Sequence, residues 1–223
     1  RQGKTEVYIK LIEDLILKGK QVLYLLPEIS LTSQIVNRLA ARFGSQVEVY
    51  HSKFSIHERT EVWQKVLDNQ GKGQVIVGTR SAVLLPFKSL GLVIVDEEHE
   101  NSYKQFDPAP RYQARDSAIY LANLMKAKVL LGSATPSLET AENVRNKKYG
   151  WVTLTERYGG VALPAIKLID LKEAHRKKEI KGMFSSQLIQ AIKGTLSAGK
   201  QVILFQNRRG YASISECTSC GHS

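Results

Sequence analysis

The sequence predicts an α/β protein in which a parallel sheet is flanked by helices. Over residues 1–145, short runs of β-branched residues alternate with amphipathic stretches, which is the pattern of a parallel α/β sheet. Several of these apolar runs are followed at once by polar or small residues, where such proteins place ligand chemistry. The composition, 43% hydrophobic and 24% charged, is that of an ordinary soluble globular protein.

Apolar spacing and capping residues predict the elements of this region in order. Strands are expected at residues 21–26, 47–50, 75–77, 92–95 and 129–131. A helix should run from about residue 30 to residue 43. Another should follow Ser55 and reach residue 67, because Glu58 stands three residues on as a capping-box partner. The first helix follows Thr5, since apolar residues recur at helical spacing: Val7, Leu11, Ile12, Leu15 and Ile16.

The apolar pattern is interrupted between residues 146 and 181 by basic residues, two adjacent glycines and Pro164. We interpret residues 146–182 as a connection between two lobes, with the first strand of the second lobe at 165–170. A helix at 185–196 and a strand at 201–206 begin an α/β unit in residues 183–223. Two strands and one helix are too few to close a core. The expectation is therefore a first lobe at 1–145 followed by a truncated second lobe.

The net charge of +11, from 32 Lys and Arg against 21 Asp and Glu, favours a polyanionic partner such as nucleic acid. A basic soluble enzyme is the alternative. No apolar run approaches the roughly 20 residues that span a bilayer, and no signal peptide opens the chain, so we expect no membrane partner and a cytoplasmic location. The two cysteines, Cys217 and Cys220, exclude a disulfide framework.

Gly3-Lys4-Thr5 at a helix start matches the end of a Walker A loop. In that motif backbone amides surround phosphates, the lysine reaches the β and γ oxygens, and the hydroxyl binds Mg²⁺. An ordinary helix N-terminus explains the tripeptide better than a Walker A loop when the tripeptide is taken alone, because the upstream glycines of the motif are not present. The tripeptide needs support from other segments.

Asp96 and Glu97 supply such support, because they follow the apolar strand predicted at 92–95. A carboxylate at a strand end can hold Mg²⁺, and a second can orient the water that attacks the γ-phosphate. We assign the first role to Asp96 and the second to Glu97. The alternative is a solvated acidic turn.

Ser133 and Thr135 come directly after the strand predicted at 129–131. Small hydroxyl side chains at this point can hydrogen-bond the acidic segment and report the phosphate state to the other lobe, although a lone Ser/Thr-Pro turn means little. The order Gly-Lys-Thr, Asp-Glu-Glu-His, Ser-Ala-Thr is what makes the joint pattern specific.

This order of motifs resembles superfamily 2 helicases, and more closely the replication-restart helicases of the PriA (primosomal protein N′) family. The segments that carry the closer resemblance are residues 26–32, 50–52, 78–82, 96–99, 103–116, 132–137 and 205–211. The resemblance implies RecA-like lobes that use ATP and Mg²⁺ to unwind DNA in the 3′→5′ direction at stalled forks. It also implies primosome and replication-restart proteins as partners. Because the family's arginine finger lies in the second lobe, we expect this chain alone to hydrolyse ATP poorly.

Residues 103–116 resemble the family's aromatic-rich loop, which couples single-stranded DNA to the ATP site. Alternating aromatic and basic side chains suit base stacking and phosphate contact, and the alternative is an aromatic contribution to the core. Arg80 is expected to contact phosphate or to cap a helix C-terminus. The residues proposed for DNA binding or coupling in this region are Arg80, Tyr103, Lys104, Phe106, Arg111, Tyr112 and the neighbouring Arg115.

Asn207, Arg208 and Arg209 resemble the start of the second helicase lobe. Cys217 and Cys220 form half of a four-ligand zinc site, and the resemblance implies Zn²⁺ in the intact protein. Without a second pair we expect these cysteines to be metal-free here. Two other functions remain open: another superfamily 2 enzyme, such as an RNA helicase or a translocase, and a non-catalytic nucleic-acid-binding module.

Overall fold

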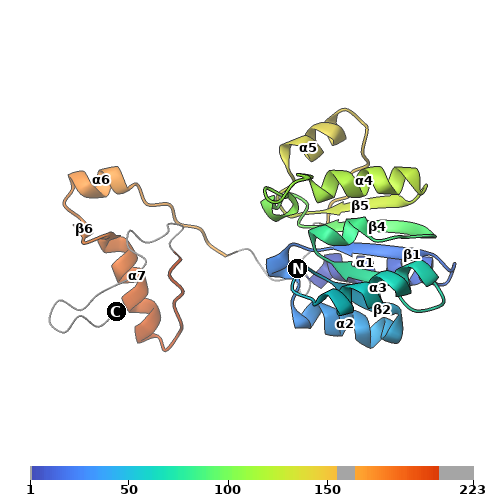
Figure 1. The fold of residues 1–223 in the computed structure, drawn as a ribbon. Coiled ribbons are helices and arrows are strands. Elements are labelled where there is room, and N and C mark those ends of the chain that lie inside the picture. Colours follow the sequence, from blue (N-terminus) through green and yellow to red (C-terminus); the bar gives the residue numbers. More distant parts are fainter. Residues whose placement is uncertain (1, 155–163, 206–223) are drawn as a thin grey trace. The chain divides into compact units, whose positions relative to one another are not determined.

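The structure is a computed structural model that describes residues 2–154 and 164–205. The chain divides into two compact units, Arg1–Val161 and Ala162–Ser223. We call them the N-terminal unit and the C-terminal unit. The N-terminal unit contains a twisted sheet with helices on both sides, as Figure 1 shows.

The sheet of the N-terminal unit is parallel throughout and its strand order is β2-β3-β1-β4-β5. Because every strand runs in the same direction, all the carboxyl ends meet at one edge, where α/β proteins bind ligands. The predicted α/β class and all five predicted strands of this unit are confirmed. The strands are β1 Gln21–Leu25, β2 Val47–Tyr50, β3 Val75–Gly78, β4 Leu90–Asp96 and β5 Lys128–Gly132.

The capping box predicted for the helix after Ser55 is present: Ser55 Oγ accepts a hydrogen bond from the Glu58 amide and Glu58 accepts one from the Ser55 amide. The helix expected from residue 30 begins instead at Ser33, because Glu28–Ser30 forms a short 3₁₀ turn (η1). The α-helices are α1 Gln2–Ile16, α2 Ser33–Phe43, α3 Ile56–Asp68, α4 Ala114–Leu124 and α5 Leu138–Arg145, and the further 3₁₀ turns are η2 Gly44–Gln46, η3 Arg80–Leu84 and η4 Asn101–Tyr103.

Two hydrophobic clusters lie on opposite faces of the sheet because successive side chains of a strand alternate. On β1, Tyr24 joins the cluster that contains residues of α1 and α2. Its neighbours Leu23 and Leu25 join the cluster that contains residues of α3, η3 and α4. All five residues of β1 are buried, as expected for a central strand of a sheet covered on both faces.

The C-terminal unit contains α6 Leu171–Arg176, a short antiparallel pair of β6 Ile180–Lys181 with β7 Phe184–Ser185, and α7 Ser186–Ser197. The helix predicted at 185–196 is confirmed by α7. The strands predicted at 165–170 and 201–206 were wrong over the residues described, because these segments pair with no strand there. Most of their apolar side chains are exposed, with 91% for Leu168 and 92% for Ile203.

Across the part of the chain that the structure describes, no helix combines the length and the apolar character needed to cross a lipid bilayer.

Candidate functional site

The first turn of α1 and the end of β4 bring Lys4, Asp96 and Glu97 together. Lys4 Nζ lies 3.0 Å from Asp96 Oδ1 and 3.0 Å from Glu97 Oε1. The three side chains are partly buried, with exposures of 22%, 14% and 26%. Residues 92 positions apart in the sequence therefore meet at the carboxyl edge of the sheet, as the combined motifs predict.

The backbone turns sharply after β4, and this turn places both carboxylates beside Lys4. Glu97 has a φ of 48°, in the left-handed region that non-glycine residues rarely occupy. Its carbonyl accepts a hydrogen bond from the Glu100 amide at 2.9 Å. Such backbone strain clusters at functional sites, where the surrounding structure must hold it in place.

The electrostatics of this cluster suit a phosphate and a hard cation. Burial would lower the pKa of Lys4, but its hydrogen bonds with Glu97 and Asp96 raise that pKa above its ordinary value, so the ammonium stays charged. Magnesium is held in proteins by one or two carboxylates together with substrate phosphates. The donor set of two carboxylates and one lysine therefore fits Mg²⁺ with a nucleotide phosphate.

Gly3 and Thr5 flank Lys4 in the first turn of α1. Gly3 is exposed, and a Cβ atom built on it would meet nothing within 4 Å. Thr5 is half-buried. Their assignment to phosphate and Mg²⁺ binding remains a prediction.

Three buried tyrosines contact Asp96 through their hydroxyls, and the sequence did not reveal two of them, Tyr8 and Tyr24, as site residues. The Tyr8 hydroxyl lies 3.2 Å from Asp96 Oδ1 and the Tyr24 hydroxyl 3.4 Å from Asp96 Oδ2. The Tyr103 hydroxyl lies 2.7 Å from the Asp96 carbonyl and 3.1 Å from the Leu25 carbonyl. The prediction that Tyr103 stacks on DNA bases is therefore wrong, because its side chain is 1% exposed. Tyr103 is a core residue whose hydroxyl connects the ends of β1 and β4.

The segment after β5 contacts the acidic turn as expected for Ser133 and Thr135. His99 Nδ1 lies 2.7 Å from Ser133 Oγ, and His99 Nε2 lies 3.4 Å from Thr135 Oγ1. Ser133 Oγ also accepts a hydrogen bond from the Thr135 amide at 2.9 Å. The Gly132 carbonyl accepts one from the Glu98 amide at 3.1 Å.

Glu98 is almost completely buried, at 1% exposure, and anchors the acidic turn to two helices. Its carboxylate accepts hydrogen bonds from Arg115 at 3.0 Å, from Thr140 at 3.0 Å, and from the Ser137 amide at 2.8 Å and hydroxyl at 3.1 Å. Arg115 lies in the first turn of α4, while Ser137 caps α5. The sequence grouped Arg115 with the DNA-contacting loop, but it is 9% exposed and pairs with Glu98 and Asp116.

The buried Glu98 carboxylate makes the stability of the N-terminal unit depend on pH. Burial alone would raise the pKa of Glu98, but the hydrogen bonds from Ser137, Arg115 and Thr140 outweigh it and hold the pKa below its ordinary 4.5. A lowered folded-state pKa stabilises the protein fully above about pH 4.5, and this contribution is lost as pH falls through the folded-state value.

We therefore expect the free energy of unfolding to fall on acidification less steeply in Glu98→Gln than in the unsubstituted protein. The variant should be less stable near neutral pH, and the two curves should converge at low pH. Urea unfolding followed by circular dichroism between about pH 3.5 and 7 measures both curves. Parallel curves would contradict this role of Glu98.

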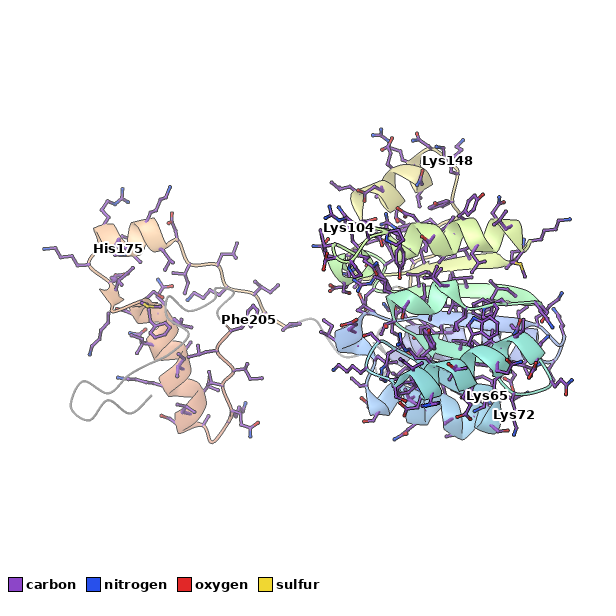
Figure 2. The ribbon with its side chains drawn as sticks, viewed as in Figure 1. Lys65, Lys72, Lys104, Lys148, His175 and Phe205 are labelled. Atoms are coloured by element: carbon purple, nitrogen blue, oxygen red, sulfur yellow. The ribbon has the colours of Figure 1, made fainter. Side chains whose placement is uncertain are left out.

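The loop before α4, residues 104–113, carries most of the residues expected to contact DNA. Lys104 and Gln113 form an antiparallel bridge that closes the loop. Lys104 Nζ lies 5.1 Å from the centroid of the Phe106 ring, and that ring is 62% exposed. Figure 2 shows Lys104 at the surface of the N-terminal unit, where the chain enters this loop.

Arg111 and Tyr112 lie within this loop, and Arg80 contacts its start. Arg80 donates a hydrogen bond to the Lys104 carbonyl at 3.1 Å, immediately after η4, and so ties η3 to the start of the loop. Arg111 is exposed and Tyr112 is half-buried. The structure thus leaves Lys104, Phe106 and Arg111 accessible. The DNA binding or coupling predicted for these three residues, and for Arg80 and Tyr112, remains a prediction.

Five predicted site residues lie outside the described residues, namely Asn207, Arg208, Arg209, Cys217 and Cys220. Within residues 2–154 and 164–205, no group of three or more His, Cys, Asp or Glu is placed to hold a metal ion. A Mg²⁺ held with nucleotide does not require such a group, because phosphates and waters supply most of its ligands.

Comparison with known proteins gives a consistent group of relatives. The family model described as DEAD/DEAH box helicase matches residues 2–144. The chain is 47% identical over 220 residues to "Replication restart protein PriA" of Rickettsia prowazekii, covering 99% of this chain and 33% of that protein. For the proteins of the same name from Haemophilus influenzae and Bacillus subtilis the identities are 44% and 43%, covering 98% and 99% of this chain. The chain spans 29% and 27% of those two relatives, so it covers about a third of their length or less.

Proposed function

Because this chain belongs to the DEAD/DEAH box helicase family, we propose that its N-terminal unit is the ATP-binding lobe of a 3′→5′ DNA helicase of replication restart. The observation that carries the proposal is the convergence of Lys4, Asp96 and Glu97 within 3.0 Å contacts at the carboxyl edge of the parallel sheet. The relatives named PriA support the replication-restart role.

Each residue of the cluster has a separate role in ATP hydrolysis. Lys4 binds the β and γ phosphates, with Gly3 and Thr5 beside it in the first turn of α1. Asp96 holds Mg²⁺, and Glu97 orients the hydrolytic water and accepts its proton. When bound, Mg²⁺ neutralises charge on the phosphates.

The surface loop and the segment after β5 connect this site to DNA. Lys104, Phe106 and Arg111 contact single-stranded DNA at a fork, while Arg80 and Tyr112 support the loop. Ser133 and Thr135 pass the state of the ATP site onward through His99. Primosome and replication-restart proteins are the proposed partners of the whole protein. Asn207, Arg208 and Arg209 would begin the second lobe, and Cys217 and Cys220 would take part in a Zn²⁺ site.

Replacing Lys4 by alanine tests the ATP site in the full-length protein. We expect DNA-stimulated ATP hydrolysis to fall by about 100-fold or more, since one strong donor to the reacting phosphate is lost. Lys10→Ala is the matched control, because Lys10 lies on the same helix with its side chain 76% exposed, and its hydrolysis rate should stay unchanged. Undiminished hydrolysis in Lys4→Ala would refute the assignment of the ATP site.

The choice of nucleic acid separates the remaining candidates. Stronger stimulation of the full-length protein by forked DNA than by linear duplex or RNA supports replication restart. Preferential stimulation by RNA or by linear duplex points to an RNA helicase or a translocase. A full-length protein that binds DNA without hydrolysing ATP would be a non-catalytic binding module. This chain alone should hydrolyse ATP poorly.

A further inference from the structure

Two tyrosine hydroxyls from different elements hold the side chain of one carboxylate. Tyr8 comes from α1, one helical turn after Lys4, and reaches Asp96 Oδ1 at 3.2 Å. Tyr24 is the last residue but one of β1 and reaches Asp96 Oδ2 at 3.4 Å. Each oxygen of Asp96 therefore has its own phenol donor.

The two rings also fix each other. Their centroids are 5.6 Å apart and their planes meet at 77°, an edge-to-face contact that aromatic pairs favour. Tyr8 is 3% exposed and Tyr24 is 0% exposed. Phenylalanine would fill the same space without a buried hydroxyl, and a buried hydroxyl is unfavourable unless it finds a partner. Here both hydroxyls find the same partner.

Both phenols can act as donors near neutral pH, because the ordinary pKa of tyrosine is about 10. The main chain of Asp96 is held separately, since the Tyr103 hydroxyl contacts its carbonyl from the opposite face of the sheet. With its main chain and both side-chain oxygens held, Asp96 keeps one orientation.

We propose that Tyr8 and Tyr24 are positioning residues that orient Asp96 for the Mg²⁺ bound with nucleotide. The inference rests on the proposed ATP site. Groups that hydrogen-bond a metal ligand set its direction, and their loss typically weakens metal binding by 10–100-fold. Neither tyrosine needs to touch the nucleotide for this role.

The test uses Tyr8→Phe and Tyr24→Phe in the full-length protein, with Tyr120→Phe as the matched control. Tyr120 lies on α4 with 65% of its side chain exposed, so its replacement should change nothing. Equilibrium binding of a fluorescent, non-hydrolysable ATP analogue is titrated with Mg²⁺. We expect each site variant to need about tenfold more Mg²⁺ for half-maximal binding. Binding of the analogue without Mg²⁺ should be unchanged.

Two results separate the possible failures. If both site variants show the same Mg²⁺ requirement as the unsubstituted protein and only a lower melting temperature, the tyrosines merely fill the core and the positioning role is overturned. Asp96→Asn serves as the reference for the site itself. Mg²⁺-dependent binding that survives in Asp96→Asn would overturn the proposed ATP site, whereas its loss there with no effect in the tyrosine variants would overturn the positioning role alone.

Discussion

Replacing Glu98 by alanine should destabilise the N-terminal unit by about 3–5 kcal/mol, the usual cost of removing one partner from a buried ion pair. Arg115, which is 9% exposed, would keep its charge without its buried partner. Ser137 and Thr140 would lose the acceptor that holds the start of α5. Urea unfolding of the two proteins side by side measures the difference.

Glu142→Ala is the control for this experiment, because Glu142 also forms an ion pair but at the surface of α5 with Arg145. Exposed pairs contribute little, so the change in unfolding free energy should stay within about 0.5 kcal/mol. A Glu98→Ala effect as small as that of Glu142→Ala would mean that the buried network does not hold the acidic turn.

Replacing Gly132 by alanine should lower ATP hydrolysis by about 100-fold in the full-length protein, a loss typical of a small displacement in an active site. A Cβ atom at Gly132 would overlap the Tyr8 hydroxyl and lie 3.1 Å from Asp96 Oδ1. Tyr8 would have to leave Asp96, and the crowding should also cost about 1–3 kcal/mol of stability. Steady-state hydrolysis and thermal unfolding measure the two effects.

Gly150→Ala is the matched control, because a Cβ atom at Gly150 meets nothing within 4 Å. A second variant tests the cause directly. Adding Tyr8→Phe to Gly132→Ala removes the overlapping hydroxyl, so part of the lost stability should return and the two changes should not be additive. Additive losses would show that crowding of Tyr8 is not the cause.

The sequence was sufficient for the sheet of the N-terminal unit because its strands are apolar runs with clear polar ends. The resemblance to PriA-type helicases is confirmed by the identity of 47% over 99% of the chain. The convergence of Lys4 with Asp96 also followed, since the carboxyl ends of parallel strands share an edge. The strands predicted at 165–170 and 201–206 were wrong over the described residues. An apolar segment forms a strand only when another strand pairs with it, and neither segment is paired among those residues.

The residues around the site were harder to predict because their roles depend on tertiary contacts. In the sequence, Tyr24 cannot be told from any other core residue of a strand. Glu98 cannot be told from its acidic neighbours Asp96 and Glu97 in a polar turn. Tyr8 offered one usable signal, because it stands four residues after Lys4 and therefore shares its helical face. Tyr103 was misassigned since aromatic residues among basic ones suit both a core and a DNA contact.

The surface loop closed by Lys104 and Gln113 is connected to the acidic turn at both of its ends. The contacts are to Asp96 and Glu98, the residues on either side of Glu97. Just before the loop, the Tyr103 hydroxyl donates a hydrogen bond to the Asp96 carbonyl. Just after it, Arg115 donates one to the Glu98 carboxylate. Residues at the two ends of the loop therefore hold the acidic turn on both sides of Glu97, whose backbone is in the left-handed region.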